Sequence, residues 1–399
     1  MPGPLSGITV LEFATMIVGP MATQYLGDLG ADVIKIESPE GDLTRRIGPR
    51  RSPNMASFFL NSNRSKRSIV LDLKRPEAKP ALTALVRKAD VILHSVRIDA
   101  AARIGLSYKQ LAAINPSIIY CHVSGYSNRG ELAGRPAYDD VIQAHSGLAM
   151  LQSVAAGEPR YIPSIFADKV SALQAAMAVN AALAHQARTG EGQEINVPMF
   201  ESMVAFNTIE HLWGENFQPP LGKMGYEPIS SGSRRPFRTS DGHYMCVLPY
   251  TDPHWQRFAR GIGDAELEND PRYKLHAARQ ADQPGFWAEV GRQVAKKTRA
   301  EWVKILTDAD VPHAVASTLE ELLSDPHLES VGFWRIEEHP SEGKLRYAPT
   351  PIEMSKTPVD GSRPAPRLGE HSEEVLSEAG IDADTIADMR KKGVLGEAA

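Results

Sequence analysis

The chain has 399 residues, of which 42% are apolar and 23% charged, and its formal net charge is -5. These values are typical of a soluble globular protein with two or three domains, and they argue against a disordered chain. No stretch approaches about 18 uninterrupted apolar residues, and the first residues lack the basic start and long apolar core of a signal peptide. We therefore expect a cytoplasmic protein with no membrane partner.

The two cysteines, Cys121 and Cys246, lie far apart inside apolar runs and lack the spacing of metal ligands. A disulfide framework or a zinc site is therefore not expected, and both thiols are predicted to be reduced. We predict no metal and no permanently bound cofactor.

A basic segment interrupts the otherwise acidic chain between residues 44 and 75. It holds nine basic side chains and one acid, which leaves a net charge of -13 on the rest of the chain. The acidic remainder would repel a long phosphate backbone, and the segment offers few aromatic rings for base stacking. We therefore expect a small phosphorylated ligand rather than nucleic acid. The alternative is a solvated loop with scattered arginines.

Short β-rich runs alternate with helical stretches through the first half of the chain. The strands are expected at 8–13, 31–37, 68–73, 89–96 and 118–124, and the helices at 19–29, 76–88 and 107–114. This alternation predicts an α/β fold with a parallel sheet wrapped by helices. The turn after the first strand contains Gly19 but no G-x-G-x-x-G, so a nicotinamide cofactor is not supported.

The second half begins with an Ala-rich segment, 168–188, which predicts a long helix ended by Gly190 and Gly192. A strand is expected at 194–199, and residues 214–241 have the composition of a linker and loops.

A smaller α+β domain is expected to follow. It would open with a strand at 242–249 and contain helices near 253–260, 284–296 and 299–309. Thr298 and Glu301 form a capping-box motif at the start of the last of these helices. Residues 338–370 are Pro-rich and predicted to be extended, before a short helix at 371–380.

Several segments carry a resemblance to a known family. They include PLSGITVLEF, YLGDLGADVIKIE, NRSKRSIVLDLK, KADVILHSV, DKVSALQAAMAVNAALAHQARTGEGQEINVPMFESM and LGEHSEEVL. In this order they resemble family III CoA transferases, which include formyl-CoA and carnitine CoA transferases and the related α-methylacyl-CoA racemases. The match runs through nearly the whole chain.

The resemblance implies a particular domain organisation. A large, doubly wound CoA-binding domain would be built from both chain ends, 1–200 and 335–399, with a small α+β domain at 225–325 inserted between them. The segments 201–224 and 326–334 would be linkers. Two chains would interlock as a homodimer, so that folding and dimer formation could not be separated.

CoA transfer between carboxylic acids needs a carboxylate nucleophile that can form an anhydride and then a thioester. The family's nucleophile is an aspartate at the start of a long helix, and it corresponds to Asp168 here. A helix start offers backbone N–H donors and a positive dipole end, which we expect to keep this carboxylate ionised. The alternative is a purely structural helix cap, because Asp is a favoured N-cap residue.

Tyr138 stands where the racemases of the superfamily have a histidine. Tyrosine is poorly suited to exchange a proton near neutral pH, so transfer is favoured over racemisation. An acyl-CoA racemase or epimerase and a non-catalytic CoA-binding protein remain alternatives. His145 lies nearby but is interpreted as a packed or surface histidine.

The resemblance also implies a set of CoA contacts. The expected contacts are Val18, Leu71, Asp72, Leu73, Lys74, Ser95, Val96, Arg97, Arg103, Arg135 and Tyr138. Val18 would approach the thiol end through its backbone. Ser38 replaces an arginine of the formyl-CoA transferases, so phosphate binding is expected to shift to Arg45, Arg97 or Arg103.

The glycine-rich loop of formyl-CoA transferases is replaced here by SSGSRRPF at 230–237. Arg234 and Arg235 could bind a second carboxylate in bidentate fashion, which points to a dicarboxylic acid such as succinate. A solvated basic loop is the alternative. The predicted partners are thus an acyl-CoA, a carboxylic acid and a second copy of the chain.

Overall fold

The computed structural model describes residues 3–359 and 363–396. The chain divides into two compact units. Unit 1 comprises Met1–Ala149, Tyr161–Asn207 and Gly332–Ala399, and unit 2 comprises Met150–Arg160 and Thr208–Val331. The domain limits expected from the resemblance stay a prediction, but residues 150–160 group with the smaller unit rather than with the larger one.

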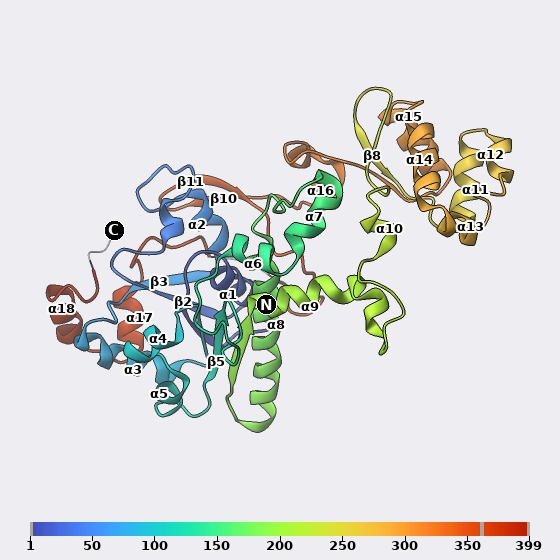
Figure 1. Ribbon diagram of the computed structural model, residues 1–399. Coiled ribbons are helices and arrows are strands. Elements are labelled where there is room, and N and C mark those ends of the chain that lie inside the picture. The colour runs from blue at the N-terminus through green and yellow to red at the C-terminus, as the bar shows by residue number, and fades with distance from the viewer. Residues whose placement is uncertain (1–2, 360–362, 397–399) are drawn as a thin grey trace. The chain divides into compact units, whose positions relative to one another are not determined.

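Unit 1 is built on a six-stranded sheet (Figure 1). Its strands are β1 (Thr9–Phe13), β2 (Asp32–Glu37), β3 (Lys66–Val70), β4 (Val91–His94), β5 (Ile119–Ser124) and β6 (Glu194–Pro198). Every pair is parallel, in the order β3-β2-β1-β4-β5-β6. The predicted parallel sheet is therefore confirmed. The strand order reverses between β1 and β4, and a crevice is expected at the carboxyl ends of these strands.

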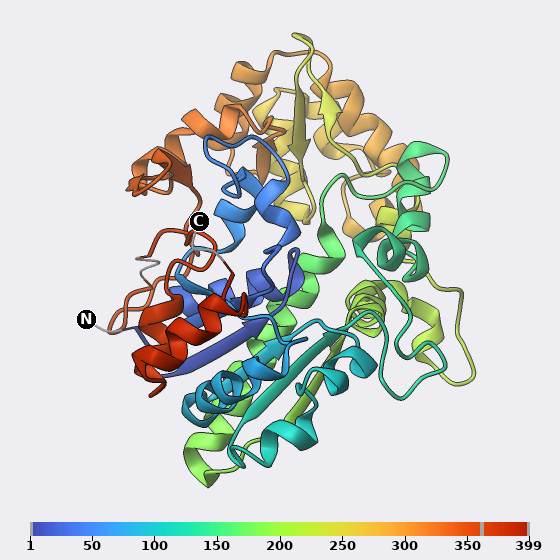
Figure 2. The same cartoon turned by 90° about the vertical axis from the view of Figure 1, so that its left-hand side faces the viewer.

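Helices cover both faces of this sheet, as the two views show (Figures 1 and 2). On one face, α1 (Val18–Asp28) and α8 (Phe166–Thr189) contact each other and the strands. On the other face, one apolar core joins the strands to five helices. These are α3 (Lys79–Lys88), α4 (Ile98–Arg103), α5 (Tyr108–Ala112), α17 (Ser372–Glu378) and α18 (Ala383–Lys391). Burial on both faces agrees with the apolar residues of these strands, although buried charged side chains interrupt β1, β2 and β3.

The long helix α8 confirms the prediction made from its alanines. Its buried side is lined by small residues, among them Ala172, Ala175 and Val179. It ends at Gly190, whose φ of 73° is the left-handed conformation that favours glycine at a helix end.

Other parts of unit 1 differ from the sequence-based expectation. An antiparallel hairpin of β10 (Arg335–His339) and β11 (Gly343–Tyr347) overlaps the start of the segment 338–370, which is predicted to be extended without such pairing. The segment 201–224, which stays a predicted linker, overlaps the helix α9 (Met199–His211), and this helix crosses the boundary between the two units. The remaining elements here are η1 (Leu43–Arg46), α2 (Ser57–Ser62), η2 (Pro76–Ala78) and α6 (Asp139–His145), while α7 (Leu148–Ala156) leads into unit 2.

Unit 2 has a small antiparallel sheet in the order β7-β8-β9, formed by Phe237–Arg238, Tyr244–Val247 and His313–Val315. Five of its helices lie between β8 and β9 in the chain, namely α11 (Asp252–Gly261), α12 (Ala265–Asn269), α13 (His276–Ala281), α14 (Gln283–Val294) and α15 (Arg299–Asp308). Further short helices of this unit are η3 (Trp213–Asn216), α10 (Glu227–Ser230), η4 (Glu321–Ser324) and α16 (Pro326–Ser330). Trp255, Trp287 and Trp302 lie in its aromatic core. The capping box of Thr298 and Glu301 at the start of α15 is confirmed.

Within residues 3–359 and 363–396, no helix is long and apolar enough to cross a bilayer. The same residues contain no group of three or more His, Cys, Asp or Glu side chains arranged to hold a metal ion.

Candidate active site

A pocket of about 200 Å³ opens in unit 1 at the carboxyl ends of β1, β4, β5 and β6. This is where the reversal of strand order favours a ligand crevice. Six of the residues expected from the sequence line it, namely Val18, Ser95, Arg97, Arg135, Tyr138 and Asp168. The fold thus brings together residues that are up to 150 positions apart in the sequence.

The other expected CoA contacts lie outside this lining. Leu71, Asp72, Leu73 and Lys74 follow the carboxyl end of β3, and Asp72 is anchored by its backbone N–H, which donates to the Val394 carbonyl oxygen at 2.9 Å. Arg103 is the exposed last residue of α4, and Val96 lies between two residues of the lining.

Asp168 occupies the first turn of α8 and is 9% exposed. The N-cap of this helix is Ile165, which makes no side-chain cap hydrogen bond, so Asp168 is not the cap residue. The backbone N–H of Asp168 instead donates to Oδ1 of Asp139 at 3.1 Å. The purely structural explanation of Asp168 as an N-cap therefore does not hold.

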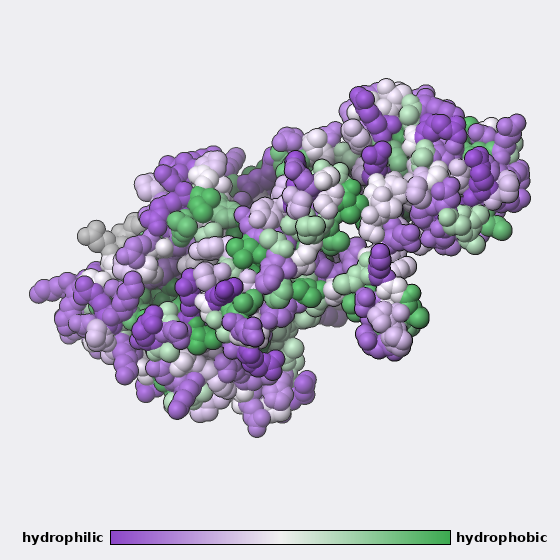
Figure 3. Space-filling model, in the orientation of Figure 1, coloured by the Kyte–Doolittle hydropathy of each residue, from purple (hydrophilic) through white to green (hydrophobic). Residues whose placement is uncertain are grey.

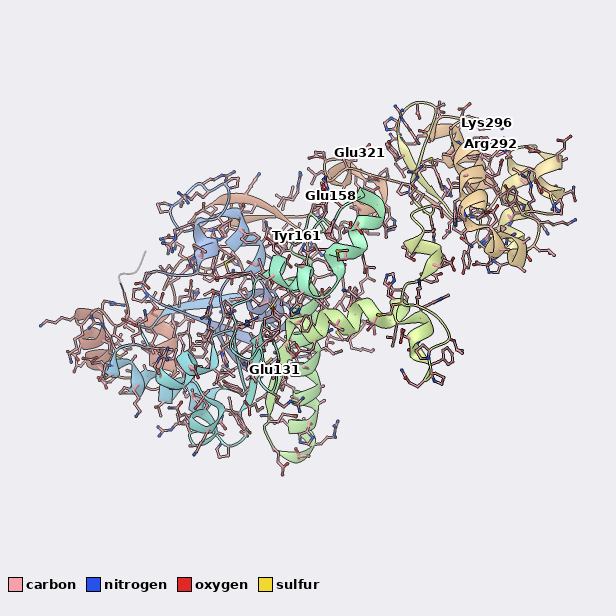
Figure 4. All side chains as sticks on the ribbon, in the orientation of Figure 1. Glu131, Glu158, Tyr161, Arg292, Lys296 and Glu321 are labelled. Carbon is pink, nitrogen blue, oxygen red and sulfur yellow. The ribbon has the colours of Figure 1, made fainter. Side chains whose placement is uncertain are left out.

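A second side chain of the helix α6, Gln143, holds Asp139 and the segment before α8 in place. Gln143, one turn after Asp139, donates from Nε2 to Asp139 Oδ2 at 2.6 Å and to the Ser164 carbonyl oxygen at 3.1 Å. Its Oε1 accepts from the backbone N–H of Ile162 at 2.9 Å. The segment before α8 is thus tied to α6. Figure 4 labels Tyr161, which lies in this segment.

The electrostatics of Asp168 differ from the expectation. Burial, and then the carboxylates of Asp139 and Asp140, raise the pKa of Asp168 to about 7. The helix start was expected to stabilise the ionised form of Asp168, but burial and the two neighbouring carboxylates outweigh that effect. A carboxylate with this pKa is a stronger base than an ordinary aspartate and is still ionised to a large extent near neutral pH.

The turn between β1 and α1 forms another wall of the pocket through Thr15, Met16 and Val18. Met16 has a φ of 67°, which is unusual for a residue with a side chain. A Cβ atom on Gly19 would lie 2.1 Å from the Cβ of Ala14, so only glycine fits in this tight turn.

Two buried histidines at the base of the pocket were not predicted as functional residues. His122 lines the pocket, and its ring stacks on that of His94 with centroids 4.5 Å apart. His94 Nε2 lies 2.6 Å from the hydroxyl oxygen of Tyr120. Burial, and for His94 also the neighbouring His122, lowers the pKa of His94 to about 3, and burial lowers that of His122 to about 4. Both rings are therefore neutral near pH 7.

His145 is an exposed histidine, which is one of the two expected alternatives. Its ring stacks on Phe200 with centroids 4.3 Å apart, and its Nδ1 lies 3.3 Å from the Tyr126 hydroxyl oxygen.

The basic segment is not the continuous phosphate-binding surface that its charge suggested. Four of its cations are buried and paired with carboxylates. The pairs are Arg45 with Glu37 at 2.7 Å, Lys66 with Glu12 at 2.8 Å, Arg67 with Glu378 at 2.7 Å and Arg64 with Asp28 at 3.5 Å. Arg45 is thus corrected from a phosphate ligand to a structural residue. The exposed cations of the segment are Arg46, Arg50, Arg51, Lys74 and Arg75.

Arg234 and Arg235 belong to unit 2. The guanidinium carbon of Arg234 lies 6.0 Å from the ring centre of Tyr250 and 5.9 Å from that of Trp287. Arg235 is exposed. Arg234 is thus oriented by aromatic faces, while its neighbour faces solvent.

Comparison with known proteins identifies the family of this chain. The model of CoA-transferase family III matches residues 5–372. The succinate–glutarate CoA-transferase of Agrobacterium fabrum is 35% identical over 94% of this chain and 95% of its own. The succinyl-CoA:mesaconate CoA-transferase of Haloarcula marismortui is 29% identical over 96% and 98%. The crystal structure of a CAIB/BAIF family protein from Brucella suis superposes with a TM-score of 0.81 and 30% identity, covering 95% of this chain and 100% of that one. The chain therefore belongs to CoA-transferase family III.

Proposed function

We propose that this CoA transferase moves CoA from an acyl-CoA to a carboxylic acid through a CoA thioester on Asp168. The observation that carries the proposal is the position of Asp168. Its side chain is buried in the lining of the pocket at the carboxyl ends of β1 and β4, and it has no role as a helix cap. A raised pKa, caused by burial and two nearby carboxylates, makes it a more basic nucleophile than a solvated aspartate.

The reaction follows from carboxylate chemistry. Asp168 attacks the acyl carbonyl carbon, and the carbon–sulfur bond breaks to give an acyl–aspartyl anhydride and the CoA thiolate. The thiolate then attacks the aspartyl carbonyl carbon, which releases the free acid and leaves CoA as a thioester on Asp168. The acceptor acid repeats these two steps in reverse, so that its acyl-CoA leaves and the aspartate is regenerated.

The proposed CoA site extends from this pocket. Val18 lies in the first turn of α1, where its backbone is suited to approach the thiol end. Ser95, Val96 and Arg97 follow β4, and the exposed cations Lys74 and Arg103 are suited to the phosphates. CoA is then a co-substrate rather than a resident cofactor.

A dicarboxylic acid such as succinate is the proposed partner acid. The names of two relatives include succinate or succinyl-CoA, which supports a second carboxylate in the substrate. Arg234, oriented by Tyr250 and Trp287, and the exposed Arg235 are the proposed ligands of that carboxylate.

We also propose an interlocked homodimer in the cytoplasm. Apolar side chains are exposed on the two helices α8 and α9: Leu173 is 53% exposed, Met177 67%, Phe206 44% and Ile209 79%. Figure 3 shows hydrophobic residues reaching the surface among hydrophilic ones. Exposed apolar area of this kind is typical of subunit interfaces.

The direct test is a screen of acyl-CoA donors against mono- and dicarboxylic acceptors, with products identified by mass spectrometry. We expect the wild type to transfer CoA to a dicarboxylic acid and the Asp168→Asn variant to lose this transfer while it still binds CoA. Replacing Arg234 and Arg235 by Gln should remove the preference for a dicarboxylate over a monocarboxylate of equal length. An Asp168→Asn protein with the wild-type transfer rate would overturn the proposal.

A further inference from the structure

Next to the turn that lines the pocket lies a group of buried charges that the transfer chemistry does not use. Glu12 on β1, Lys35 on β2 and Lys66 on β3 are each at most 1% exposed. Glu12 accepts from Lys35 Nζ through Oε1 and from Lys66 Nζ through Oε2, both at 2.8 Å. The Oδ2 atom of Asp42 lies 3.0 Å from Lys35 Nζ, so that two carboxylates balance two ammonium groups.

Both lysines also reach the backbone of the turn that forms a wall of the pocket. Lys35 Nζ donates to the Ala14 carbonyl oxygen at 2.8 Å, just before this turn. Lys66 Nζ donates to the Pro20 carbonyl oxygen, also at 2.8 Å, just after it. The residues between these two anchors include Thr15, Met16 and Val18, which line the pocket.

Further contacts hold the same turn. The Thr23 hydroxyl donates to Glu12 Oε2 at 2.6 Å, and the backbone N–H of Met16 donates to Asp42 Oδ1 at 3.3 Å. The left-handed φ of Met16 costs free energy and persists only where its surroundings determine it. The buried lysines hold the backbone before Met16, at Ala14, and after it, at Pro20, and thereby help to fix its conformation.

Stability alone does not account for a charged cluster at this depth. Replacing a buried ion pair by apolar side chains of similar volume is often neutral or stabilising. Apolar side chains, however, cannot donate to the carbonyl oxygens of Ala14 and Pro20, so the turn would lose its links to the buried charges on both sides. The Thr23 hydroxyl, 3.1 Å from the Pro20 carbonyl oxygen, would still contact that acceptor.

We propose that Glu12, Lys35 and Lys66 are positioning residues that hold the turn Thr15–Gly19 in the geometry needed for CoA transfer. The inference rests on the proposed function of the pocket, because this turn is where the thiol end of CoA would lie. It predicts that loss of a lysine lowers the rate of the chemical step more than it weakens the binding of the remote nucleotide.

The strand β3 offers a matched control. Arg67 follows Lys66 directly and is also buried, but it lies on the opposite face of the sheet, where it pairs with Asp32, Glu374 and Glu378. The variants Lys66→Met and Arg67→Met each remove one buried cation from the same strand. Both should lower Tm, but only Lys66→Met should displace the turn.

The experiment compares transfer kinetics and hydrogen exchange well below the Tm of each variant. For Lys66→Met we expect kcat to fall about ten- to a hundredfold, with little change in KM for the acyl-CoA, since small displacements at the reacting centre have effects of this size. The peptide covering 14–23 should exchange faster in Lys66→Met than in Arg67→Met. Equal loss of kcat in both variants, or no difference in exchange, would contradict the proposal.

A second variant keeps the proposal testable if the Lys66→Met protein fails to fold. Glu12→Gln combined with Lys66→Met leaves Lys35 and Asp42 as a balanced pair, so Tm should recover. The Lys66 ammonium that links the Pro20 carbonyl oxygen to the buried charges is still missing, so kcat should stay low. Recovery of kcat together with Tm would show that only charge balance matters. If the wild type itself transfers no CoA, the proposed function fails, and the exchange of peptide 14–23 still tests the positioning role.

Discussion

The charge state of Asp168 links a single buried carboxyl group to the pH dependence of the reaction. Since the nucleophile is the ionised form and its pKa is raised to about 7 by burial, Asp139 and Asp140, kcat/KM should rise about tenfold per pH unit below 7 and level off above it. Asp139→Asn removes one of the two carboxylates, so the midpoint should move to lower pH. A kcat/KM that is flat between about pH 5 and pH 8 would rule out this assignment.

The stacked histidines His94 and His122 should make the fold sensitive to acid. Their pKa values are lowered to about 3 and about 4, chiefly by burial, while an unfolded chain titrates near 6.5. Below pH 6.5 the unfolded state therefore binds more protons than the folded state. The folded state keeps its full unfolding free energy above that pH and loses part of it as the pH falls toward 4. Between pH 7 and pH 5 we expect a loss of about 2 kcal/mol per histidine.

Denaturant unfolding at both pH values measures this effect. His122→Asn should have a smaller pH dependence of the unfolding free energy than the wild type. An unchanged pH dependence would show that His122 is already solvated or paired in the native protein.

At this scale, the resemblance to a family named Asp168 and five other residues that the fold brings to one pocket, whereas the count of charges suggested a continuous basic surface that the fold does not form. The count could not show that Lys66 and Arg67 lie on opposite faces of β3 and are neutralised by Glu12 and Glu378, which are distant in the sequence. Ion pairs of this kind are a property of the folded sheet rather than of a segment.

The tight connection between β1 and α1 leads to a prediction at the scale of elements. In Gly19→Ala the new Cβ would lie 2.1 Å from the Cβ of Ala14 and 3.2 Å from Cδ2 of Leu93, so the turn must shift. We expect a loss of about 1–3 kcal/mol in unfolding free energy, together with a lower kcat. Gly130→Ala is the control, because its Cβ would meet only the Ser127 carbonyl oxygen at 3.8 Å. Equal effects of the two variants would refute the role of the turn.

Elements with strong local signals were predicted well, and those stabilised by partners were not. The strands β1, β4 and β5 of the parallel sheet are mostly apolar, and α15 carries its own capping box. The hairpin of β10 and β11 is rich in charged residues and depends on cross-strand pairing that composition does not reveal. The helix α18 does have a local signal, because the side chain of Asp382 caps it by accepting from the Thr385 N–H at 2.9 Å.

At the scale of the whole molecule, the alternation of strands and helices predicted a parallel sheet but not its order. The order β3-β2-β1-β4-β5-β6 depends on which way each connection turns, and the spacing of strands along the chain is compatible with other orders. This order is what creates the crevice at β1 and β4 where Asp168 lies.

The proposed homodimer leads to a prediction about mass and surface. Leu173 and Met177 lie one turn apart on α8 and are exposed, so they form a single apolar strip. We expect light scattering to give twice the chain mass of 43.6 kDa, and Leu173→Glu with Met177→Glu to impair dimer formation or folding. Leu43→Glu, at another residue that is 53% exposed, should change neither. A wild-type monomer in solution would disprove the dimer.

The thioester on Asp168 is the central claim, and mass spectrometry of the enzyme tests it most directly. The wild type is incubated with an acyl-CoA in the absence of an acceptor acid, quenched and digested. The peptide containing Asp168 should carry CoA, and the modification should disappear when a dicarboxylic acceptor is added. Transfer of CoA with no adduct on this peptide, or transfer at the wild-type rate by Asp168→Ala, would contradict the account.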